Sequence, residues 1–173
     1  MSLSQWIAAR KRTWISIVVG TLTWAAAFAI GLKTLHIAPT LATSAERLGY
    51  AVQLLVAVSV LVLLMVSACF RVFDTAAAED PFANAESEGW RIHQRVLQNT
   101  VEQSLIFAPA LLGLAVRVDA GHTHVLPLLT ILWCAGRVLF WLGYRISPML
   151  RGPGFEWTLF SSLAALGWFV WTL

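Results

Sequence analysis

The sequence predicts an all-α integral membrane protein, and two observations support that fold class. First, 58% of its 173 residues are hydrophobic and only 12% are charged, whereas about 25% of the residues of a soluble domain are charged. Second, the apolar residues form runs of about 20 residues, which is the length that a helix needs to cross the hydrocarbon core of a bilayer. The strands of a membrane barrel would be shorter and would alternate apolar with polar residues, and the sequence lacks that alternation.

Five apolar runs predict five membrane-spanning helices. The first two runs contain no charged residue, the third contains Glu102 and the fourth contains Arg137. In chain order, the predicted helices cover residues 13–32, 48–70, 96–116, 125–144 and 157–173. The sequence Gly152-Pro153-Gly154 predicts a turn before the fifth helix, because glycine and proline interrupt helices. Residues 71–95, which carry five acidic residues, form the one long connection.

The distribution of positive charge predicts which side of the membrane each connection faces. With a cytoplasmic amino terminus, eight Lys and Arg residues face the cytoplasm and three face the opposite side, an excess that cytoplasmic loops usually show. The two groups are Arg10, Lys11, Arg12, Arg71, Arg91, Arg95, Arg145 and Arg151 against Lys33, Arg47 and Arg117. Because these residues lie at the ends of apolar runs rather than in a cluster, we expect no nucleic-acid partner.

The amino terminus has an alternative interpretation as a signal peptide. Residues 10–12 are basic, an apolar run follows, and Ala42-Thr43-Ser44-Ala45 has the small residues of a cleavage site. Cleavage after Ala45 would leave four helices, and the same side of the protein would face the cytoplasm.

Charged and polar residues inside the third and fourth helices are the most informative feature of the sequence. A charge in the bilayer core costs at least about 2.5 kcal/mol, so that it is usually paired or functional. At 100° per residue, the polar residues of each helix share one face. These faces carry Arg95, Asn99 and Glu102 on one helix, and Arg137, Phe140 and Tyr144 on the next. A fourth helix that continued past Pro148 would add Arg151 to its face.

The two polar faces predict a ligand site that opens at the cytoplasmic surface. With a rise of 1.5 Å per residue, Arg95 lies about 10 Å closer to the cytoplasm than Glu102 on the third helix. Tyr144 lies about 10 Å closer to the cytoplasm than Arg137 on the fourth helix. Arginine binds carboxylates in a bidentate manner, and Glu102 can accept an ammonium group. A small zwitterion with several carboxylates suits this set, and glutathione has the matching groups. A structural ion pair between Glu102 and Arg137 is the alternative.

Two motifs resemble the signatures of one family of membrane proteins. Residues 95–102, with the sequence RVLQNTVE, resemble the R-x-x-x-N-x-x-E signature of the MAPEG family, the membrane-associated proteins of eicosanoid and glutathione metabolism. Residues 137–144, with the sequence RVLFWLGY, resemble the family's R-x-x-[YFH]-x-x-G-Y signature, and Arg151 also matches a frequent arginine. The resemblance covers about residues 48–173. It implies a four-helix domain over residues 47–173, preceded by an amino-terminal segment with one additional transmembrane helix over residues 1–46.

The resemblance implies a function and an assembly. It implies a homotrimer in a bacterial inner membrane, with a site that faces the cytoplasm and takes glutathione as co-substrate. The thiolate of glutathione would attack a lipophilic electrophile or reduce a lipid hydroperoxide, so that the partners would be membrane lipid, a lipophilic small molecule and further copies of the chain. The residues implied in glutathione binding are Arg95, Asn99, Glu102, Arg137, Tyr144 and, on a weaker match, Arg71, and Arg151 is implied as the catalytic residue at the sulfur.

Two other functions remain open on the sequence alone. Phe140 stands where many catalytic members carry tyrosine or histidine, which favours a non-catalytic homologue that binds lipid or glutathione. The other alternative is a small transporter subunit with a structural ion pair between Glu102 and Arg137. We expect no metal site, because His122 and His124 have only Asp119 as a nearby third ligand.

Overall fold

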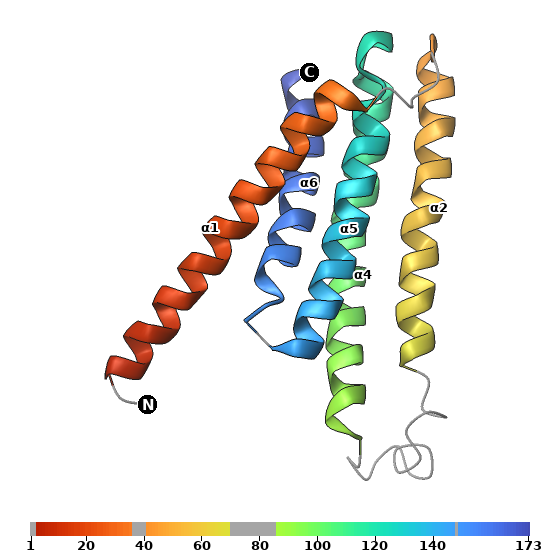
Figure 1. The fold of residues 1–173 in the computed structure, drawn as a ribbon. Helices are drawn as coiled ribbons and strands as arrows, with labels where there is room; N and C mark the ends of the chain where they lie inside the picture. Colours follow the sequence, from red (N-terminus) through yellow and green to blue (C-terminus); the bar gives the residue numbers. More distant parts are fainter. Residues whose placement is uncertain (1–2, 36–40, 70–85, 148) are drawn as a thin grey trace.

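The computed structural model describes residues 3–35, 41–69, 86–147 and 149–173. This part of the chain folds into five long α-helices and one short 3₁₀ helix, which confirms the predicted all-α class (Figure 1). The helices are α1 (Leu3–Thr34), α2 (Ser44–Ala68), α4 (Glu88–Arg117), η2 (Ala120–His122), α5 (Val125–Ile146) and α6 (Gly152–Trp171).

Four of the helices form a bundle, and α1 leans against its outside. α5 packs along α6 and also contacts α2 and α4, while α2 packs along α4. α1 contacts α6 along its middle, from Ser16 to Trp24, and contacts α5 at Gly31, while its first turns diverge from the bundle (Figure 1). The middle of α1 borders the candidate site described below.

Side-chain caps decide where two of the helices begin. Thr43 and Glu46 form a reciprocal capping box at the start of α2, with hydrogen bonds of 3.2 and 2.9 Å. Ser87 accepts a hydrogen bond from the backbone N–H of Trp90 and caps α4. Because of this cap, α4 begins at Glu88 and not at residue 96, so that the connection before it is shorter than the sequence predicted.

The start of α6 also differs from the prediction. The segment Gly152-Pro153-Gly154 forms the first turn of α6 and not a separate turn before a helix at residue 157. Proline is tolerated there because the N–H groups of a first helical turn have no partner within the helix. The fourth helix ends at Ile146, so that it does not continue past residue 148.

Close backbone contact between α5 and α6 explains the glycines at their crossing. A Cβ atom on Gly154 would lie 2.2 Å from the backbone nitrogen of Phe140 and 2.6 Å from the carbonyl oxygen of Gly136. A Cβ atom on Gly143 would lie 2.3 Å from the carbonyl oxygen of Leu150. Small residues at helix crossings allow backbones to approach this closely inside a membrane.

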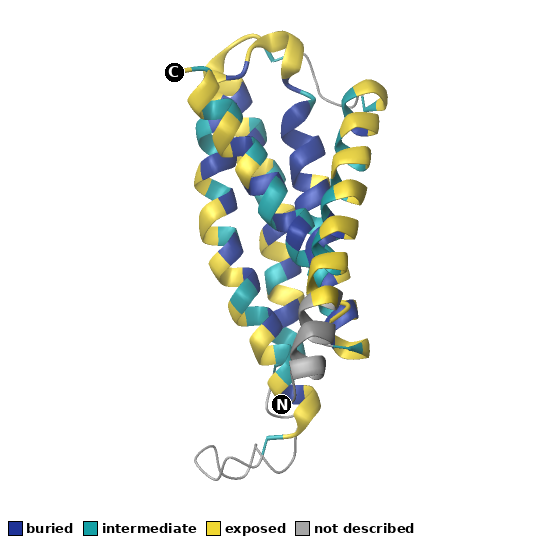
Figure 2. Ribbon diagram, turned by 90° about the vertical axis from the view of Figure 1, so that its left-hand side faces the viewer, coloured by how far each residue is buried: buried dark blue, intermediate teal, exposed yellow. Residues whose placement is uncertain are grey.

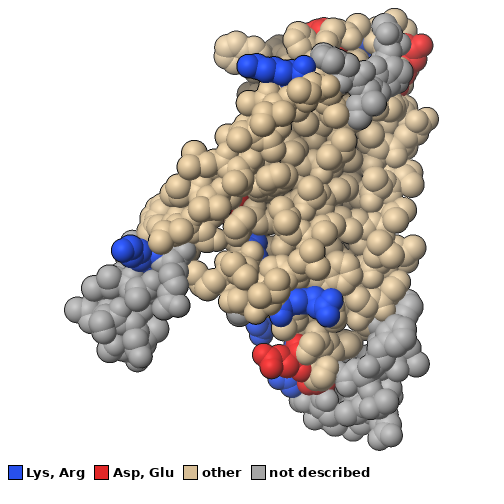
Figure 3. Space-filling model, in the orientation of Figure 1, with Lys and Arg blue, Asp and Glu red and all other residues tan. Residues whose placement is uncertain are grey.

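The distribution of buried and charged residues fits an integral membrane protein. Four helices, over Thr13–Thr34, Ser44–Ala68, Glu88–Arg117 and Ala120–Ile146, are long and apolar enough to cross a membrane. α6 is not among them, so that the prediction of a fifth span is not confirmed. Buried residues face the inside of the bundle (Figure 2), and the described charged residues gather mainly at its two ends (Figure 3).

Polar contacts close the end of the bundle that carries the carboxyl terminus. Arg47 of α2 donates to the carbonyl oxygen of Ala115 at the end of α4, and Arg117 donates to the carbonyl oxygen of Thr172. In the connection after α4, Asp119 lies 2.8 Å from the imidazole of His122. This hydrogen bond holds the pKa of the Asp119 carboxyl below its usual range.

The substitution Gly154→Ala tests the close contact between α5 and α6. We expect it to lower the free energy of unfolding by at least about 1–3 kcal/mol, because the new methyl group would overlap backbone atoms of α5. Gly167→Ala on the same helix is the control, since a Cβ atom there meets nothing within 4 Å. Denaturant titration of both variants in detergent measures the effect, and an equal stability of the two would contradict the described crossing.

Candidate functional site

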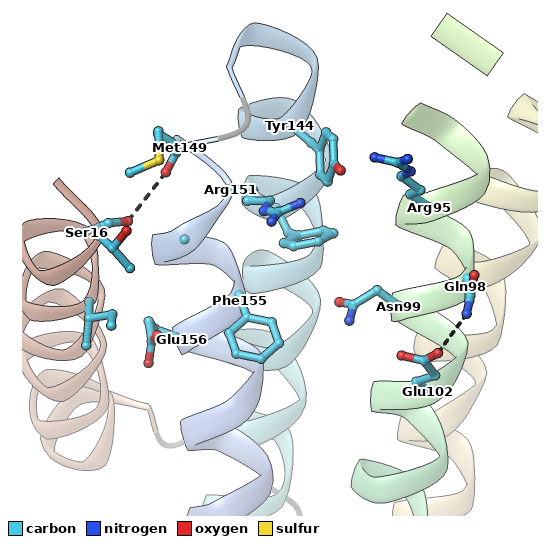
Figure 4. A pocket seen from close by; sticks show the side chains of 14 residues that line it. Ser16, Arg95, Gln98, Asn99, Glu102, Tyr144, Met149, Arg151, Phe155 and Glu156 are labelled. Carbon is cyan, nitrogen blue, oxygen red and sulfur yellow. Dashed lines mark hydrogen bonds between the residues drawn. The ribbon is translucent and has the colours of Figure 1, made fainter. Parts of the chain in front are cut away.

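A cavity of about 620 Å³ opens between α4 and the opposing helices α1, α5 and α6 (Figure 4). α4 contributes one wall with a row of polar side chains, and the first turn of α6 contributes the other with the last turn of α5. The amino-terminal half of α1 lines one edge. The cavity lies toward the end of the bundle that carries the turn between α5 and α6.

The α4 wall contains the three residues that the sequence placed on one helical face. Arg95, Asn99 and Glu102 all line the cavity, as the spacing i, i+4 and i+7 predicted (Figure 4). Gln98 lines it as well, and its side-chain amide donates to Oε1 of Glu102 at 3.1 Å. The wall therefore presents one guanidinium, two amides and one carboxylate to a ligand.

On the opposite wall, a second guanidinium lies over an aromatic ring. Tyr144 belongs to the last turn of α5, and Arg151 is the N-cap residue of α6. The Cζ atom of Arg151 lies 4.7 Å from the ring centroid of Tyr144, which is a cation–π contact. Arg151 reaches the cavity because the chain turns back after Ile146, and not because the fourth helix continues.

Arg137 lies behind the cavity wall and does not line the cavity. Its side chain is completely buried, with 0% exposure. Nη1 donates to Oδ1 of Asn99 at 2.8 Å, and Nη2 donates to the hydroxyl of Thr158 on α6. The Cζ atom lies 4.6 Å from the ring centroid of Phe140. Arg137 thus joins α4, α5 and α6, and it holds the side chain of Asn99 at the cavity.

The structure does not form the ion pair between Glu102 and Arg137 that one alternative function required. Glu102 is exposed at the cavity and accepts a hydrogen bond from Gln98, while Arg137 bonds to Asn99 and Thr158. The guanidinium of Arg137 thus donates to two neutral acceptors, Asn99 of α4 and Thr158 of α6, and not to a carboxylate. The alternative of a structural ion pair between Glu102 and Arg137 is therefore not supported.

The structure brings most of the predicted site together. Arg95, Asn99, Glu102, Tyr144 and Arg151 line one cavity. Arg137 is one layer behind it, and Arg71 lies outside the described residues.

Sequence reasoning missed Glu156, Ser16 and the contribution of α1 to the cavity. Glu156 is buried on α6 and faces the cavity beside α1. It was missed because the predicted fifth helix began one residue after it. The sequence does contain a signal for Glu156, which is a charged residue directly before an apolar run. A charged residue inside an apolar run was the signal that identified Glu102.

Comparison with known proteins identifies the family. A model of the MAPEG family matches residues 21–171, which is most of the chain. The protein belongs to the MAPEG family. No curated protein and no solved structure gives a match. Membership places this MAPEG protein among the membrane proteins of glutathione and eicosanoid metabolism, and the match begins inside α1, so that part of this helix belongs to the matched region.

The substitution Thr158→Val tests the position of Arg137. We expect it to lower the free energy of unfolding by about 1–3 kcal/mol, because a buried guanidinium N–H would lose its acceptor. Thr130→Val is the matched control, since the buried hydroxyl of Thr130 bonds only to a carbonyl oxygen of its own helix, that of Leu126. Equal losses in denaturant titrations of the two variants would contradict the bridging role of Arg137.

Proposed function

We propose that this MAPEG protein is a membrane enzyme that activates the thiol of glutathione and transfers the sulfur to a lipophilic electrophile, or uses it to reduce a lipid hydroperoxide. The observation that carries the proposal is the cavity in which two guanidiniums, two amides and the carboxylate of Glu102 converge from α4 and from the N-cap of α6. Glutathione has two carboxylates, one ammonium, two amide bonds and a thiol. In this set, Arg95 complements one carboxylate, Glu102 the ammonium group, Gln98 and Asn99 the amide bonds, and Arg151 the thiolate.

Each polar side chain of the α4 wall suits a ligand group of complementary charge. Arg95 lies at the outer part of the α4 wall and suits a carboxylate, which guanidinium binds through two N–H groups. Glu102 lies deeper on the same wall and suits the ammonium group (Figure 4). Asn99, held by Arg137, suits an amide bond of the ligand because its side chain both donates and accepts.

In the proposed chemistry, Arg151 stabilises the thiolate. A free thiol has a pKa near 8.5, so that only about 3% is ionised at pH 7. A guanidinium in a poorly hydrated site favours the charged form and raises that fraction. The thiolate then attacks a carbon of the electrophile, and as the carbon–sulfur bond forms, the bond from that carbon to its leaving group breaks and the leaving group departs with the electron pair. With a hydroperoxide, the thiolate attacks the terminal oxygen, the O–O bond breaks, and the alkoxide takes a proton and leaves as the alcohol. The sulfenic acid of glutathione then reacts with a second glutathione to give the disulfide and water.

We also propose that three copies of the chain assemble around this site. Glu102 is exposed on α4 in the single chain, beside exposed apolar residues such as Leu105 and Ile106. An exposed carboxylate at this depth in a membrane is costly, and a neighbouring copy that supplies a partner for it would lower that cost. A non-protein partner could also cover it, so that the assembly is tested separately below.

The cavity is proposed to open to the cytoplasm of a bacterium, from its inner membrane. The support is the distribution of positive charge over the two ends of the bundle, because cytoplasmic ends usually carry more Lys and Arg. Among the described side chains, the end near the cavity has five such residues and the other end has three. The two groups are Lys11, Arg91, Arg95, Arg145 and Arg151 against Lys33, Arg47 and Arg117.

A non-catalytic homologue that binds lipid or glutathione is the second candidate. Phe140 favours it, because this ring lies against Arg137 and Tyr144 in the cavity wall and offers no hydroxyl to a reacting sulfur. The transporter alternative has no support from an ion pair, because Glu102 and Arg137 have other partners in the single chain.

The substitution Arg151→Ala tests the proposed chemistry. On titration of the detergent-solubilised protein with glutathione at neutral pH, we expect a saturable thiolate absorbance for the wild type. For the variant, we expect binding to persist while the thiolate falls to the few per cent of the free thiol. Arg145→Ala is the control, since this exposed arginine lies outside the cavity lining. Binding without thiolate in the wild type would favour the non-catalytic homologue.

Native mass spectrometry from nanodiscs tests the assembly. We expect the mass of three 19.0 kDa chains, because a closed ring of copies lets each chain cover the exposed face of the next. A monomer under conditions that preserve the thiolate signal would contradict the trimer and leave the proposed chemistry intact.

A further inference from the structure

Hydrogen bonds and close packing hold α1 against α6. The indole N–H of Trp24 donates to the hydroxyl of Ser161 at 3.1 Å, and the indole N–H of Trp157 donates to the hydroxyl of Thr23 at 3.0 Å. The two backbones are also close, since a Cβ atom on Gly20 would lie 2.9 Å from a backbone Cα atom of α6. Hydrogen bonds between helices and small residues at their contact are typical of helix association in membranes. α1 therefore has a defined position beside the cavity.

Three residues of α1 line the cavity on the amino-terminal side of this contact. They are Thr13, Ser16 and Ile17, and their spacing of i, i+3 and i+4 places them on one face of the helix. Ser16 and Ile17 are half-buried and Thr13 is exposed, so that this wall is accessible from outside the chain. All three precede residue 21, at which the match to the MAPEG model begins. The α1 wall is therefore a feature of this chain that the family model does not describe.

The two sides of the cavity differ in character. The side along α4 carries the polar groups that suit glutathione. The side beside α1 is lined by Ile17, by Met149 and by the ring of Phe155, with Glu156 as its charged member. Arg151 lies between the two sides (Figure 4).

In the proposed binding mode, glutathione leaves the side beside α1 open. Its carboxylate, ammonium and amide groups lie along α4, and its sulfur lies at Arg151. A second substrate must bring its reacting carbon to within about 3–3.5 Å of that sulfur, and the space beside α1 is next to Arg151 (Figure 4). The mainly apolar side chains there favour the binding of a lipophilic group.

We propose that the lipophilic electrophile binds between α1 and the start of α6, with its apolar group between Ile17 and Phe155, and that Ile17 determines the size of the group that is accepted. The inference rests on the proposed function for the identity of the nucleophile. Ile17 acts on specificity alone, because its side chain offers contact and no chemical group. The proposal also requires that α1 is retained, since cleavage after Ala45 would remove this wall.

The test compares two electrophiles of different size, 4-methylbenzyl bromide and 4-butylbenzyl bromide, with the full chain and glutathione in nanodiscs. The thiolate attacks the benzylic carbon, the carbon–sulfur bond forms, and bromide leaves with the electron pair of the carbon–bromine bond. The readout is the ratio of kcat/KM for the butyl compound to kcat/KM for the methyl compound. Comparing variants on the same pair of compounds cancels their different partition into lipid.

Ile17→Trp should lower this ratio by at least about tenfold, because the larger side chain would occupy the space of the butyl group. Ile17→Ala should raise the ratio. Val18→Trp is the matched control and should leave it unchanged, since Val18 is 50% exposed and lies outside the cavity lining. All three variants should retain the thiolate signal with glutathione, which shows that the fold and the α4 side are intact.

A second measurement does not depend on the proposed chemistry. A photoreactive 4-butylbenzyl alcohol, with a diazirine on its alkyl chain, has no leaving group and does not react with glutathione. On irradiation it should label Thr13 or Ile17, and an excess of the unlabelled alcohol should suppress that labelling. Ile17→Trp should abolish the suppressible labelling, and Val18→Trp should not. The intact mass should be that of the whole 19.0 kDa chain with its label.

The possible outcomes separate this proposal from the proposed function. Equal ratios for Ile17→Trp and Val18→Trp, with the thiolate formed in both, would overturn the α1 site. Suppressible labelling confined to residues outside the α1 wall, or a mature chain that lacks α1, would also overturn it. Suppressible labelling of Thr13 or Ile17 without any thiolate would support the α1 site and contradict the proposed function alone.

Discussion

The hydrogen bonds of one buried guanidinium connect the parts of the site. Arg137 reaches from α5 to Asn99 on α4 and to Thr158 on α6, and its side chain has no access to solvent. Unpaired, this charge would be one of the most expensive groups that a membrane protein can bury. The three helices must therefore keep the positions at which both acceptors reach it. The consequence for function is indirect, since Arg137 positions Asn99 while other residues face the ligand.

The close packing of α5 against α6 determines on which side of these two helices the cavity lies. α5 and α6 contact each other through backbone atoms at Gly136 and Gly154, so that no ligand fits between them. The cavity lies on the side of α5 and α6 that faces α4. The chain turns sharply after α5, and this turn places Arg151 above the ring of Tyr144 at the opening. The backbone contact between α5 and α6 thus leaves the polar cavity on the side that faces α4.

The sequence predicted the fold class and the α4 wall well, because helical periodicity alone determines which residues share a face. Arg95, Asn99 and Glu102 line the cavity for that reason. Tertiary contacts decided the rest. The partners of Arg137 could not be read from spacing, since Asn99 and Thr158 lie on two other helices. The role of α1 was missed because an apolar helix with few polar residues gives no sign of the neighbour against which it packs.

The apolar surroundings of the membrane determine where the charged residues of this protein lie. Charges in the described residues lie mainly at the two ends of the bundle (Figure 3), and the exceptions are concentrated at the cavity. In the proposed function, fixed charges in surroundings less polar than water strengthen the electrostatic interaction with a ligand, and the proposed thiolate depends on that interaction. The apolar surroundings also admit molecules that dissolve in lipid and not in water.

The affinity for glutathione is the measurement that tests this account most directly. Calorimetric titration should be made with the wild type, with Glu102→Gln, and with Glu88→Gln as a control on the same helix outside the cavity. The account predicts saturable binding of glutathione by the wild type and by the control, and a loss of affinity of at least about tenfold for Glu102→Gln. Equal affinity of all three proteins, or no binding by the wild type, would contradict the assignment of this cavity.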